Sequence, residues 1–501
     1  MTLFERILTA RGLVTRAARE AFLQPDYMAV KHDPFLLPDM NKAVARLKQA
    51  REQGEKIVIY GDYDIDGLSA TALLLDAFGK FGFKDVDAFI PNRFVEGYGM
   101  TMGAVDKVYD MGADLIVTVD TGSLCHAEIE YASSLGIDTV VTDHHNVAET
   151  PPPSVAAVNP KFSGHTYPFR DLCGAGVAFK LVQALQTELD GLPDGYEKWL
   201  LDLVALGTVC DIVTLADENR ANVYWGLEVL KKQQRPGLKA LMAVAGVEPE
   251  QVNARHLGFG LGPRMNAAGR LETAQHALDM LVARDGLAAL EASEKLEELN
   301  VKRRGIQDEI FEEACQQADE MSDDRVLVVS SDGWNHGVIG IVASKLVEKY
   351  KKPVFIIGER GEEATGSARS FGDFSAADAV RAADGIIIKG GGHGAAAGVT
   401  LATEKIGDFR RRVNEFYDSL QLTNQERYLL PRADVEIDDF SEIDEELVEN
   451  LARMEPFGNG NPEPVVKITT ASVLSARRMG ADGQHVKLAL RDKNGKVLQM
   501  L

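Results

Sequence analysis

The chain has 501 residues, of which 45% are hydrophobic and 26% are charged, and this is the composition of an ordinary globular protein. The length exceeds that of one compact core and predicts about three domains, while the lack of an apolar run of roughly 18 residues argues against a membrane protein. The net charge of −22 taken alone argues against a nucleic-acid partner, but bound cations and local basic clusters can reverse the sign within one site.

The four cysteines, Cys125, Cys173, Cys210 and Cys315, are far apart in the sequence and form no CxxC pair. This spacing argues against a zinc ribbon and against a disulfide framework, and it favours a cytoplasmic location. The N-terminal stretch MTLFERILTARGLV carries charges and has no small-residue cleavage site. We therefore expect a folded domain there rather than a signal peptide.

An α/β pattern begins at residue 56, after a region of short helices over residues 1–50. Short β-branched runs alternate with helical patterns, which predicts βαβ units and a mostly parallel sheet. A second helical region extends from about 172 to 283, so we assign residues 1–284 to the N-terminal helices and the first α/β domain. The predicted strands are KIVIY (56–60), VDAFI (86–90), DLIVTV (114–119), DTVVT (138–142) and VAAVN (155–159).

Three further segments follow. Residues 285–322 form a long polar pattern with a thin apolar stripe, which predicts one connecting helix of about 50 Å. The strand–helix pattern then resumes in a smaller α/β domain over 323–430, and strand-like runs over 431–501 indicate an antiparallel β module. The chain stops inside an apparent strand, so we expect this module to be truncated.

Acidic and histidine side chains follow the apolar runs of the first α/β domain. The crevice at the carboxyl ends of parallel strands is where such sheets bind ligands, so we expect these side chains to lie together. Clustered carboxylates repel one another unless divalent cations neutralise them. The four motifs are GDYDIDG (Asp62, Asp64 and Asp66), VTVDTG (Asp120), TDHHN (Asp143, His144 and His145) and VCDIV (Asp211).

A site of carboxylates and imidazole without thiolate favours Mn²⁺ or Mg²⁺ over zinc. There are enough acids for two ions that share one carboxylate, an arrangement that activates water against phosphoryl esters. Taken singly, a DxDxD loop or a His–His pair is more often an exposed turn than a ligand set. Four such motifs at equivalent positions make coincidence a poor explanation.

The four motifs resemble those of the DHH phosphoesterase superfamily. Further segments, in the same order over nearly the whole chain, resemble the bacterial RecJ family of single-strand-specific exonucleases. The resemblance implies a DHH domain, a DHHA1 domain and a partial OB-like β module. These segments are IPNRFVEGYG, VNPK, LCGAGVAFKL, GPRMNAAGRL, GSARS, GGGHGAAAG and EPFGNGNPEP, among others.

The resemblance also implies two Mn²⁺ ions, with Mg²⁺ as a substitute. Asp64 and Asp120 would bind one ion; the ligands of the second would be Asp66, Asp120, His144 and Asp211. Asp62 and His145 would lie beside the metals at the scissile phosphate, and Asp143 would orient His144. Two positions depart from the family pattern, with Tyr60 where many relatives have histidine and Thr121 where cysteine is usual. Neither change removes a carboxylate, so we expect the chemical properties of the site to be altered without loss of activity.

Other residues would hold the nucleic acid. Arg93 would contact the 5′-phosphate, although from the residues alone a surface ion pair is equally consistent. Arg264, Asn266 and Arg270 lie in a Gly/Pro-bounded polar stretch. From the residues alone a structural role is open, and the resemblance favours a role beside the scissile phosphate or the backbone. Ser367, Arg369, Gly391 and Gly392 would bind the 5′ end, and His393 would contact nucleic acid near the active site. Lys467, Arg477, Arg478 and Lys487 are candidates for phosphate contacts in the last module.

The resemblance implies a single-stranded-DNA-specific 5′–3′ exonuclease of DNA repair and recombination. Its partners would be single-stranded DNA with a 5′ end, a single-strand-binding protein and a helicase, with no membrane. One alternative is a DHH phosphodiesterase for short oligonucleotides or cyclic dinucleotides, which has no need of the third module. Another is a non-catalytic scaffold that binds nucleic acid, and the intact set of acids argues against it.

Overall fold

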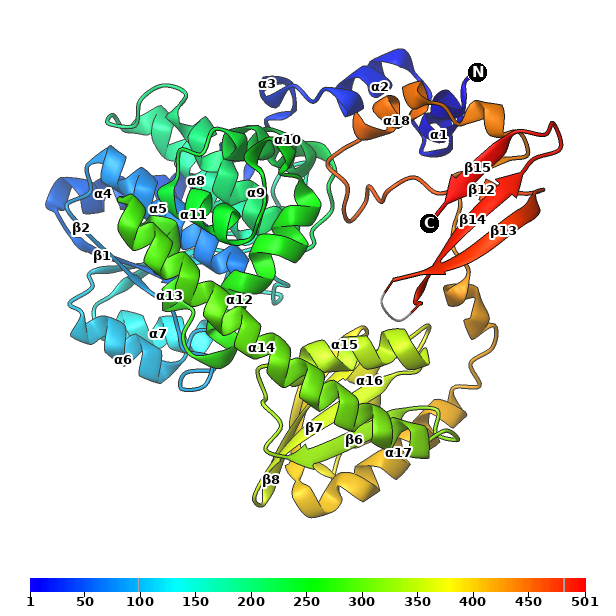
Figure 1. The fold of residues 1–501 in the computed structure, drawn as a ribbon. Helices are drawn as coiled ribbons and strands as arrows, with labels where there is room; N and C mark the ends of the chain where they lie inside the picture. Colours follow the sequence, from blue (N-terminus) through cyan, green and yellow to red (C-terminus); the bar gives the residue numbers. More distant parts are fainter. Residues whose placement is uncertain (98, 481–482) are drawn as a thin grey trace. The chain divides into compact units, whose positions relative to one another are not determined.

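The computed structural model describes residues 1–97, 99–480 and 483–501, and Figure 1 shows its helices and strands. The chain divides into two units. Unit 1 comprises Met1–Asn266, Ala274–Glu294 and Arg432–Leu501, and unit 2 comprises Ala267–Thr273 and Lys295–Pro431. Among the described helices, none combines the length and the apolar character needed to cross a bilayer.

The centre of unit 1 is a five-stranded sheet in the order β2-β1-β3-β4-β5. Every neighbouring pair is parallel, which confirms the predicted α/β class. The apolar runs are buried because helices cover both faces of a parallel sheet. The strands are β1 (Lys56–Gly61), β2 (Asp85–Phe89), β3 (Leu115–Val119), β4 (Asp138–Thr142) and β5 (Ala156–Val158).

Helices surround this sheet and fill the predicted helical region. Helix α5 begins at a side-chain cap, because Asp64 accepts hydrogen bonds from the amides of Asp66 and Gly67. Such a cap satisfies amides that the first turn leaves unpaired. The helices are α4 (Met40–Gln53), α5 (Ile65–Phe81), α6 (Met102–Asp110), α7 (His126–Ser134), α8 (Gly174–Glu188), α9 (Leu201–Cys210), α10 (Asp217–Lys231), α11 (Pro236–Val244) and α13 (Gln275–Val282).

The stretch GPRMNAAGR is helical, as α12 (Gly262–Leu271), and it lies within the helical region predicted from about 172 to 283. Proline in the first turn costs no hydrogen bond, because the amide it lacks would be unpaired there. Met265, Ala267 and Ala268 are fully buried and supply an apolar face at helical spacing.

The two ends of the chain share one small core in unit 1, which the sequence pattern did not predict. Leu3 and Ile7 of α1 (Leu3–Ala10) cluster with Leu447 of α18 (Glu445–Ala452) and with Met454. Arg11 also binds Asp434 at 2.8 Å. Helices α2 (Arg16–Leu23) and α3 (Tyr27–Val30) follow α1.

The C-terminal residues contain the predicted β structure. A parallel pair joins β11 (Val435–Ile437) to β12 (Val466–Ile468). The remaining strands β13 (Ser472–Met479), β14 (His485–Arg491) and β15 (Val497–Met500) form an antiparallel sheet. This antiparallel meander agrees with the expected OB-like module.

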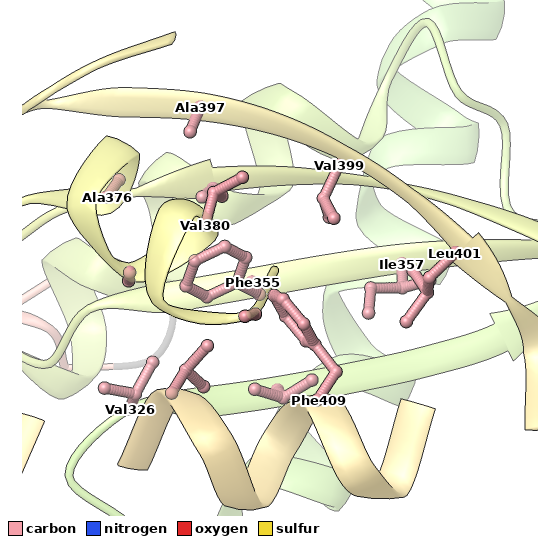
Figure 2. Close-up of a cluster of buried hydrophobic side chains, with 14 of the residues drawn as sticks. Val326, Phe355, Ile357, Ala376, Val380, Ala397, Val399, Leu401 and Phe409 are labelled. Atoms are coloured by element: carbon pink, nitrogen blue, oxygen red, sulfur yellow. The ribbon is translucent and has the colours of Figure 1, made fainter. Parts of the chain in front are cut away.

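Unit 2 contains a mixed sheet in the order β6-β7-β8-β10-β9. Figure 2 shows the buried cluster on one of its faces, where Phe355 meets Phe409 edge to face. The strands are β6 (Leu327–Asp332), β7 (Val354–Arg360), β8 (Glu363–Arg369), β9 (Ile387–His393) and β10 (Ala396–Ala402). The helices are α15 (Ile339–Tyr350), α16 (Ala376–Ala382) and α17 (Ile406–Ser419). The long helix α14 (Gly286–Glu320) confirms the predicted helix.

The glycine run GGGHG lies mainly within the strand β9. Gly390 and Gly391 belong to β9 and pair with Val399 and Gly398 of β10. A Cβ atom on Gly390 would lie 2.5 Å from Cγ1 of Val380. Close packing of α16 on the strand therefore requires glycine at that position.

The core of unit 2 allows a matched test of burial. Ile357, labelled in Figure 2, is fully buried, and Ile388 is 58% exposed. We expect Ile357→Ala to lower the free energy of unfolding by about 2–5 kcal/mol, because it leaves a cavity. The same change at Ile388 should alter it by less than about 0.5 kcal/mol. Urea denaturation of both variants measures the difference, and equal midpoints would contradict the assigned core.

Candidate metal centre

The sheet of unit 1 brings the acidic motifs to one edge. Asp62, Asp64 and Asp66 follow β1, Asp120 follows β3 and Asp143 follows β4. These three strands are adjacent and parallel, so their carboxyl ends meet. The fourth motif arrives from a helix instead, because Asp211 is the C-cap residue of α9.

The side chains predicted as ligands form overlapping groups. In each group the candidate ligand atoms lie within 4.8 Å of one another, and the groups are Asp62–Asp64–Asp120, Asp66–His144–Asp211 and Asp120–His144–His145. Nε2 of His144 lies 3.0 Å from an oxygen of Asp120. It is 3.7 Å from Asp66 and 3.6 Å from Asp211. The structure thus collects all five predicted ligands.

Asp66 is fixed by the start of helix α8. Its two oxygens accept hydrogen bonds from the amides of Gly174 and Ala175, the unpaired donors of the first helical turn. A Cβ atom on Gly207 would lie 2.4 Å from an Asp66 oxygen. Sequence reasoning gave no role to these residues, although LCGAGVAFKL and LVALGTVCDIV contain them and their small side chains mark a close approach.

Asp120 has an unusual backbone. Its φ is 61°, a left-handed conformation that residues other than glycine adopt rarely and at a cost of about 1–3 kcal/mol. A Cβ atom on Gly174 would lie 2.5 Å from the Cβ atom of Asp120. The surrounding chain therefore holds this carboxylate in a conformation that it would not adopt alone.

The residues of the cluster fit a divalent cation. Neither oxygen of Asp120, nor Nε2 of His144, has a hydrogen-bond partner within the described part of the chain, although both residues are buried. Buried polar atoms without partners are costly, and a cation would satisfy all three. Oxygen ligands with one imidazole and no thiolate suit Mn²⁺ or Mg²⁺.

Burial and mutual repulsion perturb the acids. Burial raises the pKa of Asp62 to about 7, and the charge of Asp64 adds to this effect. The same two causes raise the pKa of Asp66 to about 6. Burial, with Asp66 and Asp64, raises the pKa of Asp211 to about 8. Asp120 is affected in the same direction, and its pKa is raised well above the usual value by burial and by Asp66.

The two histidines differ in protonation. Burial, together with the charge of His145, lowers the pKa of His144 to about 3, so its ring is neutral and can bind a metal. Burial also opposes protonation of His145, but the carboxylate of Asp143 outweighs it and raises the pKa of His145 to about 9. His145 Nδ1 lies 2.9 Å from Oδ1 of Asp143. The side chain of Asp143 therefore orients the ring of His145, whereas we expected it to orient His144.

The two departures from the family pattern lie in buried positions. Tyr60 is fully buried, and its hydroxyl donates a hydrogen bond to the carbonyl of Gly99 at 3.0 Å. The carbonyl of Thr121 accepts a hydrogen bond from the hydroxyl of Thr118. Neither residue belongs to the groups of metal-ligand atoms found among the described residues.

The other predicted residues of unit 1 lie in the loop after β2 and on helix α12. Arg93 is exposed, and its guanidinium lies 5.4 Å from the ring centre of Tyr63 in the first motif. Arg264 donates to the carbonyl of Gly260 at 2.7 Å, and Asn266 is half-buried on α12. Of these three residues, Arg93 contacts an acidic motif, through the ring of Tyr63.

Within unit 2, Arg369 donates a hydrogen bond to the hydroxyl of Ser367 at 3.1 Å. Gly340, in the first turn of α15, lies beside both side chains. Arg270 donates to the carbonyl of Gly337 at 2.8 Å. His393 is exposed and accepts a hydrogen bond from the amide of Ala395. The structure therefore groups Ser367 with Arg369 at a helix start, a position that favours anions.

The raised pKa values predict a pH-dependent metal affinity. Protons on Asp62, Asp66 and Asp211 must leave before the carboxylates can bind a cation. We expect the affinity of the metal-free chain for Mn²⁺ to rise at least about tenfold between pH 6 and pH 8, with proton release on binding. Calorimetric titration in buffers of different ionisation enthalpy measures both quantities, and a pH-independent affinity would exclude this account.

Three family descriptions match the chain in order: the DHH family N-terminal domain over residues 56–208, the DHHA1 domain over 323–419 and the RecJ OB domain over 433–501. The single-stranded-DNA-specific exonuclease RecJ of Bacillus subtilis (strain 168) is 39% identical over 497 residues, which cover 98% of this chain. The chain spans 62% of that relative's length.

The RecJ exonuclease of Dickeya dadantii (strain 3937) is 37% identical over 455 residues, with coverage of 86% of this chain and 78% of the relative. The crystal structure of RecJ from Thermus thermophilus in complex with Mn²⁺ superposes with a TM-score of 0.81 at 31% identity. The superposition covers 99% of this chain and 69% of that chain. A second structure of the same protein is a complex with Mg²⁺. The chain therefore belongs to the RecJ family.

Proposed function

We propose that this chain is a metal-dependent exonuclease that removes nucleotides from the 5′ end of single-stranded DNA. The observation that carries the proposal is the buried cluster around Asp120, whose carboxylate oxygens lack hydrogen-bond partners among the described residues. Relatives at 37–39% identity bear the name single-stranded-DNA-specific exonuclease, which supports this substrate and reaction class.

Two groups of side chains would hold two Mn²⁺ ions. Asp64 and Asp120 would hold one, and Asp66, Asp120, His144 and Asp211 the other. The geometry supports this division, because Asp120 belongs to one ligand group with Asp64 and contacts His144 of the other. When bound, such ions polarise a phosphoryl oxygen and lower the pKa of a bound water, so that hydroxide forms near neutral pH.

His145 and Asp62 would act beside the ions. With a pKa of about 9, His145 carries a positive charge at neutral pH and favours binding of a phosphate. Asp143, buried and accepting the hydrogen bond of His145, keeps that charge in place. The Asp62 pKa of about 7 is suited to proton transfer near neutral pH.

Further side chains would position the strand. Arg93, beside Tyr63 of the first motif, would bind the terminal phosphate, and Arg264 with Asn266 would contact the scissile phosphate. Ser367 and Arg369, already hydrogen-bonded to each other, would also bind the 5′ end. Gly391, Gly392 and His393 would contribute backbone and ring contacts to the nucleic acid.

We further propose roles in DNA repair and recombination, with a single-strand-binding protein and a helicase as partners. A helicase would supply the single strands, and a single-strand-binding protein would keep them unpaired. The four described cysteines are all free thiols, which supports a reducing cytoplasm as the place of action.

Replacing Asp120 tests the catalytic proposal. The substrate is 5′-phosphorylated single-stranded DNA labelled at its 3′ end, with Mn²⁺, and the measurement is product length over time. We expect Asp120→Asn to lower the rate at least about 100-fold, because a shared metal ligand is lost. Asp110→Asn, an exposed position at the end of α6, should leave the rate unchanged.

A substrate panel separates the competing functions. Progressive shortening from the 5′ end, without cleavage of a matched duplex, supports the exonuclease. Cleavage restricted to oligonucleotides of a few residues would favour the phosphodiesterase, and binding without cleavage would favour the scaffold.

The 5′-end contact makes a separate prediction. We expect Arg369→Ala to reduce the preference for a 5′-phosphate over a 5′-hydroxyl by about tenfold or more, because hydrogen bonds to charged groups contribute about 1.5–3 kcal/mol. The ratio of kcat/KM for the two substrates measures this preference. Arg381→Ala, which removes an exposed arginine of α16 paired with Asp378, is the matched control. An unchanged ratio in Arg369→Ala would remove Arg369 from the 5′ site.

A further inference from the structure

The segment EPFGNGNPEP has no role in the proposed chemistry, yet its loop Phe457–Asn461 contacts the chain just after Asp211. The side-chain amide of Asn459 donates a hydrogen bond to the carbonyl of Ile212 at 2.8 Å. The carbonyl of Asn459 accepts one from the amide of Leu215, also at 2.8 Å. One residue of the C-terminal segment therefore binds both ends of the turn that follows a candidate metal ligand.

The turn after Asp211 has an unfavourable conformation. Helix α9 ends with Asp211 as its C-cap residue, and the next residue, Ile212, has a φ of 59°. Glycine is the usual residue in this left-handed position, and a β-branched side chain there is a genuine outlier. Ile212 is also 69% exposed, so little packing of its own side chain stabilises the conformation.

Two glycines of the loop lie close to this turn. A Cβ atom on Gly460 would lie 2.7 Å from Cγ2 of Thr214, and one on Gly458 would lie 2.8 Å from Cδ1 of Leu215. Gly460 also has a φ of 77°. The left-handed backbone and the close Thr214 side chain therefore favour glycine at Gly460, while the absence of a side chain at Gly458 leaves room for the end of the Leu215 side chain.

Hydrogen bonds from Asn461 and Arg220 hold the loop in place. Asn461 is buried, and its amide donates to the carbonyls of Met454 and Pro456 at 2.9 Å. Arg220 of α10 also donates to these carbonyls, at 3.1 and 3.3 Å. Anchored in this way, the loop can hold the turn at a fixed position rather than follow it.

We propose that Asn459 is a positioning residue for the metal centre: it holds Ile212 in the left-handed conformation and thereby aims the carboxylate of Asp211. The proposal rests on the assignment of Asp211 as a metal ligand. It means that the C-terminal segment completes the metal centre of unit 1, in addition to any contact that it makes with nucleic acid.

Mn²⁺ binding to the full chain tests the proposal without DNA. We expect Asn459→Ala to weaken Mn²⁺ binding about three- to tenfold by calorimetric titration, which is the loss of about one hydrogen bond. Asn459→Asp keeps the shape and removes the donor, so it should weaken binding at least as much. The matched control is Asn494→Ala. It removes a hydrogen bond to Asp439 within the same segment and should leave the affinity unchanged.

A rescue variant separates positioning from general stability. Glycine adopts the left-handed conformation without strain, so Ile212→Gly combined with Asn459→Ala should regain much of the lost Mn²⁺ affinity. Thermal unfolding of each variant is measured in parallel. An affinity that stays unchanged in both Asn459 variants, or falls without rescue and only together with the Tm, would refute the positioning role. Mn²⁺ binding without DNA cleavage by the unaltered chain would instead refute the nuclease proposal and leave this comparison valid.

Discussion

Repulsion among buried carboxylates is the constraint on which the metal centre depends. Asp62, Asp66 and Asp120 are each at most 2% exposed and, together with Asp211, they lie around one imidazole. In water these acids would ionise freely, but burial and proximity raise all four pKa values, to about 6 for Asp66, about 7 for Asp62 and about 8 for Asp211. A divalent cation would convert the repulsion into attraction, so the cluster is suited to hold one.

The local structure around Asp66 and Asp120 offsets part of the free-energy cost of burying these carboxylates, before any cation binds. The amides that open helix α8 bind Asp66, and Gly174 leaves the space in which Asp120 keeps a left-handed backbone. Each of these features would be unfavourable or unnecessary in a protein that held an ordinary polar loop here. Divalent cations at this cluster would make the local field differ from the average field of a chain with a net charge of −22, as binding of the proposed polyanionic substrate requires.

The sequence was sufficient to predict what depends on short-range pattern. Apolar runs defined the parallel sheet, and acids at the ends of those runs defined the cluster, because strand ends in such a sheet converge. It was insufficient where partners are distant in the sequence. The capping of Asp66 by Gly174 involves residues 108 apart. Spacing also does not decide which ring Asp143 orients: its carboxylate accepts a hydrogen bond from the backbone amide of His144 but pairs with the ring of His145. The strand at GGGHG was not predicted, because its glycines serve close packing and carry no apolar strand pattern.

The association of the two chain ends has a consequence for the metal centre. Helix α1 packs on α18, Arg11 binds both Asp434 and Asn461, and Asn461 braces the loop that contacts the turn after Asp211. The N-terminal helices therefore stabilise, through one chain of hydrogen bonds, a loop 450 residues further along the chain that touches the fourth acidic motif. Unit 1 is thus discontinuous in sequence but continuous in contacts, and the turn after Asp211 is held by segments that carry no candidate ligand.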